Sequence, residues 1–189
     1  MKQKLKLLLA VALLCSNAFA QKNWMGDKKG SLVGISFNLA DFKGPSGIKD
    51  PVTGKVYGTV PQMDKGLSIS YWKGLTTKID LSVKLSGMSY SELAQSGNGN
   101  SPYGFELEPT LNIRPFKDAS KISPFLTAGV SAGLYNKDFA AFVPAGVGAQ
   151  VNFSSITYLF VQAQYRFSLD KTILGDNLFY SIGFAQHIK

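Results

Sequence analysis

The sequence has few of the residues on which metal proteins and many enzymes depend. Among its 189 residues there is one cysteine, Cys15, and one histidine, His187. A transition-metal site needs several such ligands close together, so we predict no metal site and no cofactor. Cys15 lies within the first 20 residues, which have the features of a cleaved leader. No disulfide is therefore expected in the exported chain.

Long apolar runs are also scarce. No stretch after residue 20 approaches the roughly 18 apolar residues of a helical membrane span. At the N-terminus three lysines precede the short apolar run Leu7–Leu14, and Ala18-Phe19-Ala20 follows it. This order predicts a cleaved signal peptide over residues 1–20. Its removal takes away three lysines and no acid, so the formal net charge falls from +8 to +5, which is too diffuse to indicate nucleic-acid binding.

Residues 21–30 are polar and lysine-bearing, and they predict a solvated tail, which in the topology argued below is periplasmic. Residues 31–189 have the alternating pattern of one β domain. The clearest example is the stretch from Tyr103 to Leu134, in which apolar and polar residues alternate with period two on both sides of a polar turn. Its strands run to roughly ten residues, the length that a tilted membrane strand needs. Eight such segments are predicted: Val33–Ala40, Leu67–Trp72, Ile79–Ser86, Tyr103–Arg114, Leu126–Leu134, Val143–Phe153, Leu159–Phe167 and Leu178–Ala185.

The connections between these segments differ in length in a regular way. They run long (41–65), short (73–78), long, short (117–121), medium (135–142), short (154–155) and medium (168–177). Tight turns on one rim and elaborated loops on the other are typical of a transmembrane meander. An even number of strands places both termini on the tight-turn rim. The sequence therefore predicts an all-β, eight-stranded antiparallel up-and-down barrel with both termini in the periplasm.

The composition of the polar face decides which face lies outside, because a soluble barrel alternates too. A water-facing sheet carries many charges, whereas these positions are mostly Gly, Ser, Thr, Asn and Gln. We therefore predict a polar lumen. Its charged residues are Asp80, Lys84, Glu106, Glu108, Arg114 and Arg166. If the third and fourth strands are antiparallel neighbours, Lys84 meets Glu108 and Asp80 meets Arg114. These ion pairs, with Trp72, Phe160 and Phe179, are expected to fill the narrow lumen.

Aromatic residues gather at two levels of the predicted strands, as the interfacial girdles of membrane barrels do. The predicted girdle at the tight-turn ends comprises Tyr71, Trp72, Phe116, Phe125, Phe153 and Tyr158. The predicted girdle at the loop ends comprises Phe42, Tyr90, Tyr103, Tyr135, Phe142, Phe167 and Tyr180.

From about residue 31 to the end, the chain resembles small eight-stranded outer-membrane β-barrel proteins of the OmpA and OmpX type. The most specific likeness lies in the stretch from Tyr103 to Leu134, which is predicted to form a hairpin. It is carried by Asn112-Ile113-Arg114-Pro115-Phe116 and by the segment from Ser123 to Val130. The resemblance implies an outer-membrane location in a Gram-negative envelope, and assembly with periplasmic chaperones and the barrel-assembly machinery. We expect no peptidoglycan-binding domain after the barrel. The end Gln186-His187-Ile188-Lys189 departs from the usual terminal aromatic residue.

Three functions stay open from the sequence. The first is a structural or surface-binding protein without enzymatic activity, a monomer in contact with outer-membrane lipid and lipopolysaccharide. Its long loop 41–65, with Val56-Tyr57-Gly58 available for contacts, would meet an external ligand. The second is a narrow pore or a channel for a small or hydrophobic ligand. The third is an acyl hydrolase, which His187 disfavours because no acid lies beside it in the sequence and it is predicted at the periplasmic rim.

Overall fold

The computed structural model describes residues 28–42, 60, 63–90, 103–115, 121–135, 138–152, 157–170 and 173–188. Several predictions fall outside these residues: the signal peptide, the tail up to residue 27, most of loop 41–65, and the aromatic residues Phe116 and Phe153. No helix in the described part is long and apolar enough to cross a membrane.

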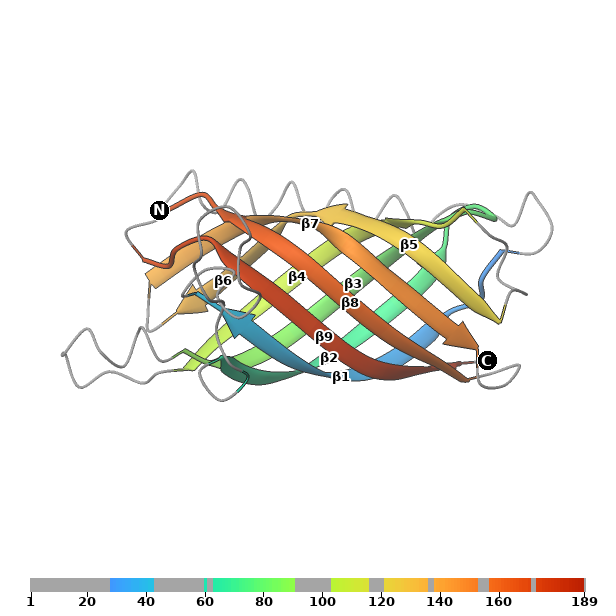
Figure 1. Cartoon of the computed structure of the whole chain (residues 1–189), viewed down its shortest axis with the longest axis horizontal. Coiled ribbons are helices and arrows are strands. Elements are labelled where there is room, and N and C mark those ends of the chain that lie inside the picture. The colour runs from blue at the N-terminus through green and yellow to red at the C-terminus, as the bar shows by residue number, and fades with distance from the viewer. Residues whose placement is uncertain are drawn as a thin grey trace, which may run out of the picture.

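Within the described residues, nine strands form one closed antiparallel sheet (Figure 1). The strands are β1 (Leu32–Asp41), β2 (Asp64–Gly74), β3 (Ile79–Ser89), β4 (Tyr103–Ile113), β5 (Ile122–Gly129), β6 (Ser131–Tyr135), β7 (Asp138–Asn152), β8 (Thr157–Ser168) and β9 (Asn177–His187). Except for β5 and β6, strands that are consecutive in the chain pair in antiparallel fashion, and β9 pairs with β1 to close the ring. β5 and β6 lie end to end between β4 and β7, so together they form one stave, that is, one strand position around the barrel. The barrel therefore has eight staves, as the alternation predicts.

The break between β5 and β6 lies at Val130 and has a local cause. β5 and β6 pair with β4 in the same register, and they also pair with β7 in the same register. No extra residue is therefore inserted between the two strands. In this register Val130 lies opposite Pro109, and Gly129 lies opposite Pro144. Proline has no backbone N–H. The Val130 amide still donates to the Pro109 carbonyl (3.2 Å), but Pro109 has no N–H to donate in return, and the two prolines together remove neighbouring ladder bonds from this stave.

The two ends of the barrel are defined by the closing pair. At the termini end Leu32 of β1 lies opposite His187 of β9, and at the loop end Asp41 lies opposite Leu178. The start of β1 and the end of β9 therefore share one end of the barrel. The placement of both termini, and the side of a membrane that this end faces, stay predictions. Figure 1 shows the staves strongly tilted around a narrow interior.

One predicted connection is wrong. The sequence predicted a loop from Tyr135 to Phe142, but β7 begins at Asp138 and pairs directly with β6, with Leu134 opposite Phe139 and Tyr135 opposite Asp138. The small residues Ala140 and Ala141 make the alternation of this segment too weak to recognise. The loop end therefore has a tight hairpin between β6 and β7.

Apolar side chains cover the outside of the staves. One row of such side chains crosses five neighbouring strands, and each residue lies directly opposite the next. The row consists of Phe184, Ile35, Ile69, Leu85 and Leu107. These five side chains are 42–61 % exposed. Their polar neighbours in sequence, such as Ser36, Ser70 and Ser86, share the opposite, inward parity. The barrel is thus apolar on its outer face.

Candidate functional site

The interior is the candidate functional site, and its middle holds the charged residues. All six residues predicted to form a lumen network are buried in the barrel: Asp80, Lys84, Glu106, Glu108, Arg114 and Arg166. Hydroxyl and amide side chains lie among them, with Ser82 bonded to Thr110 (2.6 Å) and Asn112 donating to Ser82 (2.9 Å). A buried charge is tolerated only when it is paired, so the network depends on its ion pairs.

Both ion pairs predicted from the strand register are present. Lys84 lies opposite Glu108 in the β3–β4 pair, and their Nζ and Oε1 atoms are 3.2 Å apart. Arg114 lies just beyond the end of β4, and its Nε and Nη2 atoms reach the two carboxylate oxygens of Asp80 at 2.8 and 3.0 Å. The second pair is nearer the termini end than the first.

Arg166 joins opposite sides of the interior. It extends from β8 to both glutamates of β4, with 3.1 Å between Nη1 and Oε1 of Glu106 and a close contact to Glu108. Its guanidinium lies 3.4 Å above the Phe179 ring. The hydroxyl of Tyr135 also donates to Glu106 (2.5 Å). Since β4 and β8 are not neighbours in the sheet, these contacts run through the middle of the barrel.

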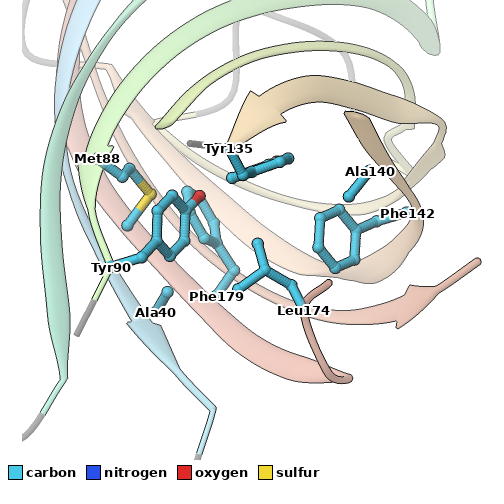
Figure 2. Close-up of a cluster of buried hydrophobic side chains, with 8 residues drawn as sticks. All are labelled: Ala40, Met88, Tyr90, Tyr135, Ala140, Phe142, Leu174 and Phe179. Carbon is cyan, nitrogen blue, oxygen red and sulfur yellow. The ribbon is translucent and has the colours of Figure 1, made fainter. Parts of the chain in front are cut away.

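Apolar clusters close the interior toward both ends. The termini-end cluster consists of Leu32, Trp72, Phe125, Tyr158, Phe160 and Ala185. Within it Trp72 stacks on Phe160, with ring centroids 4.4 Å apart and planes at 11°. The loop-end cluster, drawn in Figure 2, consists of Ala40, Met88, Tyr90, Tyr135, Ala140, Phe142, Leu174 and Phe179.

The two clusters correct the predicted girdles. Six of the assigned aromatic side chains are buried inside the barrel instead of facing outward: Trp72, Phe125, Tyr158, Tyr90, Tyr135 and Phe142. A seventh, Phe42, packs against the loop-end cluster, with its ring 5.6 Å from that of Tyr90. The physical reason is parity. Each of these residues is an even number of positions from an inward polar residue, as Trp72 is from Ser70, so it shares the inner face.

Four girdle residues do face outward. Tyr103 and Phe167 are exposed, whereas Tyr71 and Tyr180 are half-buried. Tyr71 lies toward the termini end, and its hydroxyl is 2.9 Å from that of Ser31. Whether these four lie at membrane interfaces stays a prediction.

Lys29 is an interior residue that the sequence did not indicate. It was expected in a solvated tail, but it is 3 % exposed and enters the barrel at the termini end. Its Nζ is 2.8 Å from Oδ2 of Asp80, and it also donates to Gln150. Nothing in the sequence separates Lys29 from its neighbour Lys28, because the groups that hold it come from β3 and β7, far along the chain.

His187, the residue on which a hydrolase would depend, is at the termini end. Its Nε2 atom is 2.9 Å from the Tyr158 hydroxyl, and its ring packs against Gly30. The described ranges contain no group of three His, Cys, Asp or Glu side chains that could hold a metal ion.

Comparisons with known proteins agree with this geometry at the level of the fold. No protein-family model matches the sequence, and no curated protein matches it. Among solved structures, the N-terminal β-barrel domain of Pseudomonas aeruginosa OprF is 15 % identical with a TM-score of 0.53, over 84 % of this chain and 98 % of that one. Neisserial surface protein A (NspA) is 13 % identical with a TM-score of 0.54, over 85 % and 99 %.

A third similar structure is Ail, the attachment invasion locus protein of Yersinia pestis, in complex with the heparin analogue sucrose octasulfate. It is 10 % identical with a TM-score of 0.52, over 84 % of this chain and 98 % of that one. The chain has the fold of an eight-stranded outer-membrane β-barrel. Each likeness covers nearly the whole of the other chain, and at these identities it establishes the architecture alone.

Proposed function

We propose that this protein is an integral outer-membrane β-barrel of a Gram-negative bacterium with a structural or surface-binding role. The observation that carries the proposal is the apolar outer face, in which directly opposite residues from Phe184 to Leu107 are all large and exposed. Soluble proteins rarely expose apolar patches larger than a few hundred Å². A closed barrel also satisfies the backbone within the sheet, which a hydrocarbon surrounding requires.

Cell fractionation and gel mobility test this proposal together. The protein should sediment with outer membranes, and a sample left unboiled should migrate differently from a boiled one because a closed barrel resists unfolding in detergent. Recovery from the soluble periplasmic fraction would contradict the proposal. We expect outer-membrane lipid and lipopolysaccharide to cover the apolar face, and the detergent-solubilised protein to be a monomer in light scattering.

The proposed binding role lies in the loop end and above all in loop 41–65. Between the end of β1 and the start of β2 this loop carries Lys43, Lys49 and Lys55, whereas Lys65 lies in β2. It joins two strands of a rigid barrel, the arrangement in which binding loops are usual. Deleting residues 43–63 should leave a heat-modifiable barrel, because the deletion removes no residue of β1 or β2. Loss of folding would show that the loop is part of the scaffold instead.

The apolar clusters favour a filled barrel over the alternative of a narrow pore. An eight-stranded barrel encloses room for side chains or one small ligand, and here aromatic rings occupy the interior near both ends with ion pairs between them. Planar-bilayer recordings of the purified protein should show no reproducible openings above leak. Stable openings would favour the pore.

We also propose that the protein is not an acyl hydrolase. The hydrogen bond between His187 and Tyr158 supports this, because a catalytic histidine needs a serine and an acid within hydrogen-bond reach. Lipid A isolated from cells that express the protein should keep its mass. A change in mass that is lost in His187→Ala would overturn this part of the proposal.

A further inference from the structure

The ammonium group of Lys29 lies in a cage built from four strands at the termini end. Asp80 of β3 supplies a carboxylate oxygen at 2.8 Å, and Gln150 of β7 supplies an amide oxygen. Three rings surround the same nitrogen, with centroids of Trp72, Tyr158 and Phe160 at 5.8, 5.6 and 5.5 Å. Aromatic faces at these distances attract a cation, most strongly when water is excluded. Lys29 and all five of these surrounding side chains are buried.

The backbone of Lys29 has a shaped seat as well. The Gly74 amide, at the end of β2, donates to the Lys29 carbonyl (3.1 Å). A Cβ on Gly74 would lie only 2.7 Å from the Lys29 nitrogen and 2.8 Å from its oxygen, so only glycine permits this approach. The segment 28–30 is therefore docked on the rim of the barrel, with its lysine side chain directed inside.

The cage does not depend on Lys29 for charge balance. Arg114 already contacts both carboxylate oxygens of Asp80, so Asp80 stays paired when Lys29 is absent. Trp72 and Phe160 hold each other by stacking, and Phe125 packs on the edges of both. These contacts keep the rings in place without the lysine.

We propose that the termini end of the barrel contains a binding site for a primary alkylammonium group, and that Lys29 occupies it as a tethered ligand. The carboxylate and amide oxygens accept the N–H donors, the three rings hold the charge, and the aliphatic stem passes out toward the rim. When segment 28–30 leaves, a free alkylammonium ion of similar length takes the place of the lysine. This site is independent of the proposed binding role of the loop end.

The test uses the mature chain folded in a detergent without amines. Trp24→Phe leaves Trp72 as the single tryptophan, so its emission reports the cage. In Lys29→Ala, n-butylammonium chloride should change the emission saturably. The original Lys29 protein and Lys28→Ala, a change at the half-exposed neighbour, should not respond over the same range because the cage is filled. A desolvated cation–π contact contributes about 30-fold in affinity, so n-butanol should bind at least about 30-fold more weakly than n-butylammonium.

Gly74→Ala gives an independent route, because it unseats the backbone of Lys29 and leaves every cage side chain in place. It should also gain a saturable response to n-butylammonium. If Lys29→Ala does not fold, as judged by gel mobility without boiling, refolding with n-butylammonium present should restore the heat-modifiable band. An unsaturable response, an equal response to n-butanol, or neither binding nor rescue in both variants would overturn the proposal.

Discussion

Arg166 contacts two buried carboxylates and is held at the centre of the barrel by Glu106, Glu108 and the ring of Phe179. Arg166→Met keeps much of the side-chain volume but removes the charge. Because it leaves a buried carboxylate without its cation, we expect the free energy of unfolding to fall by about 3–5 kcal/mol. The measurement is the urea midpoint for loss of the heat-modifiable band in lipid vesicles.

Charge balance predicts which second change repairs this variant. Lys84 is paired with Glu108 at 3.2 Å, so neutralising Glu106 as well leaves one cation and one anion at this level. Arg166→Met combined with Glu106→Gln should therefore be more stable than Arg166→Met alone. Equal stability of the two variants would show that the loss comes from packing against Phe179 and not from the unpaired charge.

Gly148 gives the aromatic ring of Phe125 its place in the termini-end cluster. The two residues are directly opposite in the β5–β7 pair, and a Cβ on Gly148 would lie 2.3 Å from the ring. Gly148→Ala should lower the free energy of unfolding by about 1–3 kcal/mol, because the ring is packed against Trp72 and Phe160 and must shift. The urea midpoint measures the loss.

Gly87→Ala is the matched control for Gly148→Ala. It adds the same methyl group to a strand, but there the Cβ meets Phe105 at 3.4 Å, an ordinary contact. We expect the control to be as stable as the original protein or slightly more so. A similar loss in both variants would mean that alanine itself, and not the contact with Phe125, causes the effect.

The residues that the sequence predicted correctly are neighbours across one pair of strands. Lys84 and Glu108 follow from counting along β3 and β4, and Asp80 with Arg114 follows from the same count. Arg166 could be placed inside the barrel by parity, but its partners could not be named because β8 and β4 are not adjacent. Lys29 could not be found at all, since Asp80 and Gln150 lie 51 and 121 positions away. Proximity of this kind arises only when the barrel closes.

At the scale of whole strands, alternation was enough to give the number and order of the staves, and it failed where side chains are small. The segment Phe139 to Phe142 contains two alanines, so its alternation is weak, and the sequence predicts a loop where the structure has the hairpin between β6 and β7. Alternation also gave the correct face for every buried aromatic residue. The predicted girdles are wrong because the level of a residue along its strand does not decide which face its side chain takes, whereas its parity does.

The missing ladder donor at Pro109 gives a prediction about the stave formed by β5 and β6. Pro109→Val should supply the N–H that the Val130 carbonyl lacks. One restored backbone hydrogen bond contributes about 1 kcal/mol, so the urea midpoint should rise. Leu107→Val, on the same outer face two positions away, is the control because it changes the side chain and not the ladder. If both variants behave alike, the break at Val130 does not result from the missing donor.

At the scale of the whole molecule, the barrel has the reverse of a soluble protein's distribution of polarity. Charges and amides are inside, rings fill the interior near the two ends, and large aliphatic side chains are outside. The small inward residues leave room for the rings and ion pairs, while the outward residues need an apolar surrounding. The stability of the molecule should therefore depend on lipid at its outer face and on pairing at its inner face.

A charge on the outer face tests this dependence directly. Ile69 is at the middle of β2 and 61 % exposed, between Ile35 and Leu85. In lipid vesicles Ile69→Arg should lower the free energy of unfolding by about 2–4 kcal/mol, because the guanidinium would lie near the bilayer midplane. Thr77→Arg, in the turn after β2, should cost close to nothing. The urea midpoints of both variants give the comparison. Equal midpoints would mean that Ile69 faces water, and the membrane-spanning proposal would fail with it.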